Sequence, residues 1–186
     1  MDSTADPGER LTQAAAKLIH QQGFARTTLA EIAKEANVAS GSVYYYFRSK
    51  DDIAAAIVAK RVGDIERMLQ RRNTLPDPRA RLQGLVQVWV DDRDIDSLYG
   101  CPIGSLCYEL AKGRGALSAH AAKPIRLLLD WCEAQFRALG HAKDAPASAL
   151  HLVSALQGIS LVANSLGEPA AIRHEAKNLK AWLAEY

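Results

Sequence analysis

The sequence predicts an all-α protein, with an N-terminal three-helix helix-turn-helix domain and a C-terminal helical domain. Apolar residues recur at helical spacing along most of the 186 residues, Pro and Gly interrupt them, and alternating β patterns are almost absent. Residues 28–50, TLAEIAKEANVASGSVYYYFRSK, contain two short helical patterns joined by a tight turn. We expect about nine helices, divided between a domain of residues 1–52 and a domain of residues 53–186.

The first two helices have clear start and stop signals. The first is expected over residues 9–22, with Gly23 as its stop. The second begins after Thr28, because Thr28 and Glu31 have the spacing of a capping box, and Asn37 is a suitable left-handed stop. Their apolar faces are formed by Leu11, Ala14, Ala15, Leu18 and Ile19, and by Leu29, Ile32, Ala33 and Ala36.

The third helix, within residues 39–47, is too short to be stable alone. Successive helical residues point about 100° apart, so the tyrosines at 44–46 cannot all face a core. We expect Val43 and Phe47 to anchor the helix and at least one phenol to be exposed. The second helix of a helix-turn-helix enters the DNA major groove N-terminus first, where a phenol suits a phosphate or a base edge.

Proline, glycine and capping residues predict the limits of six further helices. Residues 49–52 are expected to cap a long fourth helix that ends before Pro76. The fifth fades into the charged run DDRDID, and Pro102 opens the sixth. The remaining helices are expected at about residues 117–139, 146–166 and 170 to near the C-terminus.

Residues 10–58 resemble the DNA-binding domain of TetR-type (TetR/AcrR family) transcriptional regulators. The resemblance is carried by Gly23-Phe24, by Thr27-Thr28, by GSVYYYF at 41–47 and by Ser49-Lys50. It implies a ligand-responsive repressor that binds a palindromic operator in double-stranded DNA as a homodimer and is released by a small apolar or electrophilic effector. It implies no cofactor, no metal and no catalysis.

The resemblance also implies roles for individual residues. Bases would be approached by Ser40, Gly41, Ser42 and Tyr44; phosphates would be gripped by Thr28, Tyr45 and Lys50, and Tyr46 would contact the DNA backbone. Ala39 departs from the Ser or Thr common at that position, so one N-cap hydroxyl is missing.

An effector pocket is expected among the fifth to eighth helices. Its candidate walls are Trp89, Tyr99, Cys101, Ile103, Cys107, Leu128, Trp131 and Phe136. Cys101 precedes the sixth helix, where the helix dipole would favour the thiolate, and some TetR-type sensors of electrophiles have a similar Gly-Cys opening. The alternative is that Cys101 and Cys107 are small buried hydrophobes. Cys132 is expected in the core.

The helix at 146–166 is apolar around more of its surface than one core face requires, which indicates burial on two sides. One side would face the domain core and the other a second subunit, although a central helix of a monomer is the alternative. The candidate interface comprises Leu152, Val153, Leu156, Ile159, Val162, Leu179 and Trp182.

Composition and charge restrict the possible classes of protein. The net charge is +2, and residues 1–75 carry 11 Lys/Arg against 9 Asp/Glu, so DNA binding is argued from the motif and not from a basic footprint. Three cysteines do not indicate a disulfide framework, and the N-terminus has no signal-peptide core. We expect a cytoplasmic protein without the roughly 20 uncharged residues of a membrane span.

Two other functions remain as alternatives. One is a thiol-based redox or electrophile enzyme, on account of the Cys101 and Cys107 pair; the common hydrolase, metalloprotease, P-loop and dinucleotide motifs are absent from the sequence. The other is a DNA-architectural protein that binds no effector. The five histidines are scattered, so no zinc site is expected.

Overall fold

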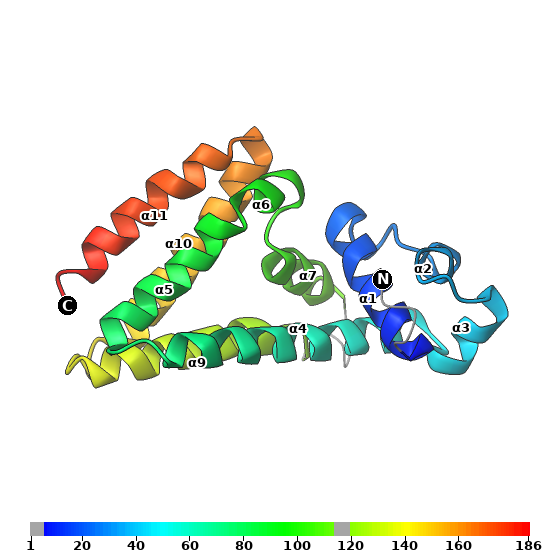
Figure 1. Cartoon of the computed structure of the whole chain (residues 1–186), viewed down its shortest axis with the longest axis horizontal. Helices are drawn as coiled ribbons and strands as arrows, with labels where there is room; N and C mark the ends of the chain where they lie inside the picture. Colours follow the sequence, from blue (N-terminus) through cyan, green and yellow to red (C-terminus); the bar gives the residue numbers. More distant parts are fainter. Residues whose placement is uncertain (1–5, 114–119) are drawn as a thin grey trace. The chain divides into compact units, whose positions relative to one another are not determined.

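The computed structural model describes residues 6–113 and 120–186, which are helical and contain no strand (Figure 1). This confirms the predicted all-α fold. The described helices are α1 (Pro7–Gln22), α2 (Leu29–Glu35), α3 (Ser40–Tyr46), α4 (Lys50–Asn73), α5 (Pro78–Asp91), α6 (Arg93–Tyr99), α7 (Pro102–Ala111), α9 (Lys123–Ala138), α10 (Ala145–Leu166) and α11 (Pro169–Leu183).

Two helices differ from the sequence prediction. The charged run after α5 forms the separate helix α6, because side chains of α10 hold its polar residues. Ser160 donates to Asp96 at 2.8 Å, and the Asn164 amide donates to the Ser97 carbonyl at 3.2 Å. The helix predicted over residues 117–139 corresponds to α9, and the first predicted positions, 117–119, lie outside the described residues.

The chain divides into two compact units. Unit 1 comprises residues 1–62 and 105–123, and unit 2 comprises residues 63–104 and 124–186. Helices α4 and α7 therefore each contribute residues to both units. The domain boundary at residue 52 was drawn from the sequence motif and stays a prediction.

Side chains cap the N-termini of helices in unit 1, and α1 begins at Pro7, two residues before the predicted start. The Asp6 carboxylate accepts a 2.9 Å hydrogen bond from the Gly8 amide at the start of α1. At the start of α4, Ser49 Oγ accepts from the Asp52 amide at 3.2 Å, and the Asp52 carboxylate accepts from the Ser49 amide at 3.0 Å. These reciprocal bonds satisfy amides that have no partner inside the helix.

Unit 1 has its own hydrophobic core, to which α7 contributes. Leu106 and Leu110 of α7 are 2% and 4% exposed and join side chains of α1, α2, α3 and α4. The second half of α7 is therefore part of the helix-turn-helix unit. The principal core side chains are Leu11, Ala15, Ile19, Ile32, Val43, Phe47, Ile53 and Ile57.

Unit 2 is built around α5, α10 and α11, which lie side by side in Figure 1, with α6 packed on α10. Its core is mostly apolar and includes a buried polar cluster, in which Trp89 Nε1 donates to Ser160 Oγ at 3.0 Å and Ser160 Oγ donates to Asp96. The largest fully buried side chains of this core are Phe136, Leu82, Leu85, Leu128, Leu152, Leu156, Ile172 and Leu183.

Helix α10 corrects one expectation from composition. Its 22 residues include no Asp, Glu, Lys or Arg, and its mean hydropathy reaches 1.4, so by length and composition alone it matches a membrane span. The expectation that no such stretch exists was wrong. The structure gives the helix another role, because Leu152 and Leu156 lie in the core of unit 2 against α5 and α11.

Candidate nucleic-acid interface

The turn between α2 and α3 is fixed by backbone geometry. Asn37 adopts the predicted left-handed conformation with φ of 51°, and the Val38 amide donates to the Ala33 carbonyl at 2.9 Å. Val43 and Phe47, 1% and 7% exposed, then anchor α3 in the core of unit 1. Their burial leaves the rest of this short helix facing outward.

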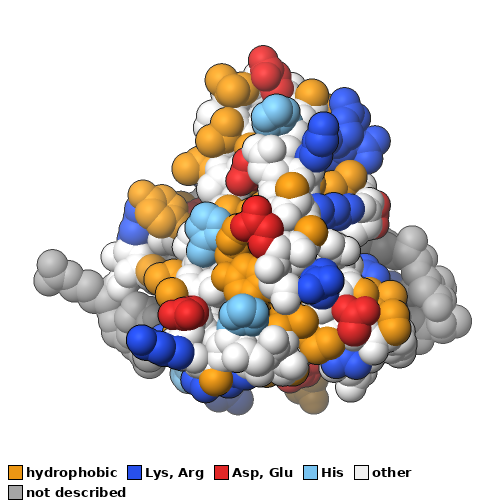
Figure 2. All heavy atoms as spheres, turned by 90° about the vertical axis from the view of Figure 1, so that its left-hand side faces the viewer, with side chains coloured by type: hydrophobic (Ala, Val, Ile, Leu, Met, Phe, Trp, Pro, Cys, Tyr) orange, Lys and Arg blue, Asp and Glu red, His pale blue; other side chains and the backbone are white. Residues whose placement is uncertain are grey.

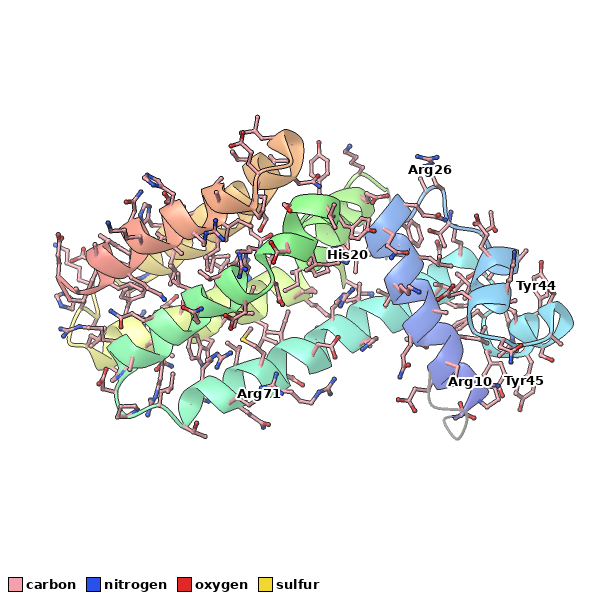
Figure 3. All side chains as sticks on the ribbon, turned by 45° about the horizontal axis from the view of Figure 1, so that its top comes forward. Arg10, His20, Arg26, Tyr44, Tyr45 and Arg71 are labelled. Carbon is pink, nitrogen blue, oxygen red and sulfur yellow. The ribbon has the colours of Figure 1, made fainter. Side chains whose placement is uncertain are left out.

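The exposed tyrosines of α3 confirm the expectation from helical periodicity. Tyr44 is 61% exposed and Tyr45 is 83% exposed, and both project away from the ribbon in Figure 3. Tyr46 is half-buried, with its ring 5.1 Å from that of Tyr45 in an edge-on arrangement. Exposing two adjacent phenols forgoes the burial that stabilises most aromatic residues. Among the residues that the structure describes, neither ring packs into the core of unit 1.

Gly41 is also unexplained by the fold alone. A Cβ built at this position would meet no atom within 4 Å, so neighbouring side chains do not require a glycine. Glycine inside a helix costs roughly 0.5–1 kcal/mol relative to alanine. A surface that approaches the backbone of α3 closely would account for it.

The N-cap of α3 is as weak as predicted. Ala39 has no side chain that caps the helix, and no side-chain cap bond is formed. Ser40 and Ser42, on the first turn of α3, are both exposed and complete its outward face.

Thr28 already uses its hydroxyl within the chain. The predicted capping box is present: the Glu31 amide donates to Thr28 Oγ1 at 3.2 Å, and the Thr28 amide donates to the Glu31 carboxylate at 2.8 Å. The Thr28 hydroxyl also donates to that carboxylate at 2.8 Å, and this bond is the main cause that lowers the pKa of Glu31. A phosphate at Thr28 would compete with Glu31 for the hydroxyl.

Lys50 also has partners inside unit 1. Its Nζ donates to the Ala25 carbonyl at 2.8 Å and lies 4.9 Å from the centre of the Phe24 ring. An ammonium group has three donors, so the bond to Ala25 leaves others for a phosphate.

Sequence reasoning did not assign the arginines that flank this surface. Arg26 lies on the turn before α2 and Arg48 directly after α3, and both are exposed. Their position next to the motif was the available signal. By contrast, the face of the molecule shown in Figure 2 mixes basic, acidic, histidine and hydrophobic side chains, and no single charge dominates it.

The candidate effector residues fall into different surroundings. Trp89, Cys101, Leu128 and Phe136 are buried in the core of unit 2, and Ile103 and Trp131 are partly buried against that core. Tyr99 is half-buried on α6. Cys107 is buried and belongs to unit 1.

Cys101 does not have the thiolate character expected from the helix dipole. Burial raises the pKa of the Cys101 thiol to about 11, and the nearby Asp96 carboxyl adds to the rise. Hydrogen bonds from the Gly104 and Ile103 amides lower the pKa of the thiol, but by less than burial raises it. The thiol is therefore protonated at neutral pH. Burial likewise raises the pKa of Cys132, which lies in the core as predicted, to about 12.

The Asp96 carboxyl was missed by sequence reasoning. It is 3% exposed, and burial raises its pKa from 3.8 to about 6, although the hydrogen bond from Ser160 opposes the rise. Asp92 raises it further. The only sequence signal was a charged run, which more often lies in solvent.

The candidate residues of the dimer interface differ in how deeply they are buried. Leu152, Val153, Leu156 and Leu179 are buried within unit 2, whereas Ile159 and Trp182 are partly buried and Val162 is 45% exposed. Other apolar residues of α10 are exposed. They are Leu150, Leu161 and Leu166, 57%, 67% and 62% exposed.

Comparisons with known proteins agree with this geometry. The family model for bacterial regulatory proteins of the tetR family matches residues 11–57. An uncharacterized HTH-type transcriptional regulator from Lactococcus lactis is 29% identical over 64% of this chain and 61% of its own length. The HTH-type transcriptional regulator BetI of Burkholderia cenocepacia is 32% identical over 47% of this chain and 46% of its own.

The matched segment thus spans about half to three fifths of these relatives. The fold match is more extensive. A TetR transcriptional regulator from Legionella pneumophila superimposes with a TM-score of 0.86 at 17% identity, covering 98% of each chain.

Proposed function

Because this chain belongs to the TetR family of bacterial regulatory proteins, we propose that it is a transcriptional repressor that binds an operator as a homodimer and is released by a small effector. The observation that carries the proposal is the exposed face of α3. Gly41, Tyr44 and Tyr45 present a close-approach position and two phenols that the chain's own packing does not use.

The proposed contacts follow from where these side chains lie. Gly41 brings the helix backbone close to base edges, and Ser40, Ser42 and Tyr44 read the bases from the same turn. Tyr45, Tyr46, Lys50 and the hydroxyl of Thr28 bind the phosphate backbone. The exposed Arg26 and Arg48 add charge on either side of the motif.

The exposed face of α10 supports a homodimer. Leu150, Leu161, Val162 and Leu166 are exposed apolar side chains of this helix, and a Cβ at Gly158 would meet no described atom within 4 Å. Exposed apolar surface of this kind is costly in water unless it is covered. A second copy that uses the same face gives a two-fold dimer, whose half-sites would lie about 34–36 Å apart on a palindromic operator.

The chemistry of the candidate residues favours a reversible, mostly apolar effector over an electrophile. Trp89, Leu128 and Phe136 are apolar side chains of the core of unit 2, so an effector that binds among them would be apolar. The Cys101 thiol is protonated at neutral pH, which disfavours capture of an electrophile. The same protonation disfavours a thiol redox enzyme, because the thiolate is the reactive form. Coupling between effector and operator binding of roughly 1–3 kcal/mol is typical of such switches.

Selection of bound sequences from random duplex DNA tests the proposal. We expect enrichment of one inverted repeat that is bound by two protomers. A screen of apolar small molecules should then find a compound that releases the protein from this DNA. Failure to enrich any sequence would contradict operator binding. Enrichment of an asymmetric site by a single protomer would contradict the dimer.

A further inference from the structure

Glu109, on the second half of α7, contacts the turn that follows α1. Its Oε2 accepts hydrogen bonds from the Phe24 amide at 2.8 Å and from the Ala25 amide at 3.3 Å. All three residues belong to unit 1, although 84 or 85 positions separate Glu109 from the turn in the sequence. This is a long-range polar contact between α7 and the helix-turn-helix.

The conformation of Gly23 makes room for this carboxylate. Gly23 ends α1 with φ of 88°, a region that favours glycine, and the chain then turns so that two successive amides face Glu109. A Cβ at Gly23 would lie 3.2 Å from Glu109 Oε1. The glycine therefore permits both the turn and the close approach of the acceptor.

The Lys50 ammonium group binds a backbone carbonyl of the same turn. Lys50 Nζ donates to the Ala25 carbonyl at 2.8 Å, and the Thr27 hydroxyl donates to the Gly23 carbonyl at 2.8 Å. Glu109 from α7 and Lys50 from α4 thus bind the amides and the carbonyl of one short segment. Hydrogen bonds to charged groups are the stronger class in proteins.

Side chains do not fill all the space beside this turn. A cavity of about 230 Å³ lies against it, lined by Phe24 and Thr27 of the turn and by Leu29, Ile32 and Lys50 among others. Phe24 is only partly buried. Phe24 nevertheless packs against the core of unit 1 and Thr27 is 2% exposed, so the polar contacts of Glu109 and Lys50 act together with side-chain packing to hold the turn.

The turn leads directly into the proposed interface. Thr28, three residues after Ala25, is the N-cap of α2, and α3 follows after the turn at Asn37. A displacement of residues 24–25 would carry the start of α2 with it. The position of α3 on DNA thus depends on where the turn is held.

We propose that Glu109 is a positioning residue for operator binding, fixing the residue 24–25 turn and through it the placement of α2 and α3. The inference rests on the proposed function. Helix α7 begins at Pro102 in unit 2 and continues to Ala111 in unit 1. The Glu109 contact therefore joins α7 directly to the turn before the DNA-binding helices, independently of α4.

The test compares Glu109→Ala and Glu109→Gln with the wild type on the selected operator and on a scrambled duplex. Glu109→Ala removes the acceptor, and we expect about a tenfold loss of operator affinity, the lower end for a hydrogen bond to a charged group. Glu109→Gln keeps an oxygen that can accept from the Phe24 amide, so it should recover most of that affinity. Glu185→Gln, which removes an exposed carboxylate from the C-terminal end of the chain, serves as the control.

Amide hydrogen exchange provides a second measurement on the same proteins. The Phe24 amide should exchange slowly in the wild type and in Glu109→Gln, and fast in Glu109→Ala, while amides of the α1 interior stay protected in all three. This pattern also shows that each variant is folded.

Two outcomes would overturn the inference. If Glu109 acted only through its charge, both variants would bind DNA more tightly than the wild type, because each removes a negative charge near phosphates. If Glu109→Ala kept full operator affinity with an unprotected Phe24 amide, the turn would not position the interface. Failure of the wild type to select any DNA would instead count against the proposed function.

Discussion

Tyr44 and Tyr45 of α3 are 61% and 83% exposed, whereas Trp89 and Asp96 of unit 2 are 5% and 3% exposed. The polar groups of the buried pair meet through Ser160. Neither tyrosine belongs to the core that the described residues of unit 1 form. The comparison contrasts exposed aromatic side chains, for which we propose a DNA partner, with polar groups that hydrogen-bond inside unit 2. Each prediction below tests one side of this comparison.

The largest expected effect distinguishes a buried aromatic side chain from an exposed one. Phe136 is fully buried between α9 and α11, in contact with Trp182 and Tyr186. Phe136→Ala should lower the free energy of unfolding by about 3–5 kcal/mol, while Tyr45→Ala should change it by less than about 0.5 kcal/mol. Urea unfolding measures both, and equal losses would remove the distinction.

Asp96→Asn should change the pH dependence of stability. The native pKa of Asp96 is about 6 and its usual value is 3.8, so the native state binds the proton more tightly than the unfolded state does. The contribution of Asp96 to stability is therefore greatest below pH 3.8 and is lost as the pH rises to about 6, a change of roughly 3 kcal/mol.

The Asn variant carries no titrating proton at this position. Its stability relative to the wild type should rise between pH 4 and pH 7, as measured by urea unfolding at both values. A constant difference would mean that Asp96 does not carry the pH dependence.

Tyr44→Ala should weaken operator binding by about 1–3 kcal/mol, because we propose that its ring contacts DNA. It should leave the free energy of unfolding almost unchanged, because the ring is 61% exposed. Tyr108→Ala is the matched control, since Tyr108 is 66% exposed but lies on α7. Binding isotherms on the selected operator measure both variants. Equal losses from the two would indicate a general effect of removing a surface aromatic.

The smallest effect is expected from thiol reagents. All three cysteines are buried, so iodoacetamide at pH 7.5 should label the native protein far more slowly than the urea-unfolded chain. Mass spectrometry of the peptides identifies the labelled position. Rapid labelling of Cys101 in the native state would restore the electrophile-sensor interpretation.

The sequence predicted local features well because their determinants are adjacent in the chain. The capping box at Thr28, the left-handed Asn37 and the outward tyrosines each depend on residues within one or two helical turns. Helical spacing also identified the apolar breadth of α10, but it did not separate the buried Leu152 from the exposed Leu161.

The contacts that sequence reasoning missed join distant positions. Trp89 and Ser160 are 71 residues apart, and Glu109 and Phe24 are 85 apart. No periodic pattern records such a pair, because each partner lies on a different helix. The helix-dipole argument for Cys101 failed for a related reason, since burial by the surrounding fold outweighs the local dipole.

Photo-crosslinking from α3 tests the central claim most directly. A benzophenone amino acid replaces Tyr44 in one variant and Tyr108 in another, two positions of similar exposure, and each is irradiated with the selected operator. We predict crosslinks to major-groove bases of a half-site from position 44 and none from position 108. Equal crosslinking from both positions, or none from position 44, would contradict the assignment of α3 as the helix that reads DNA.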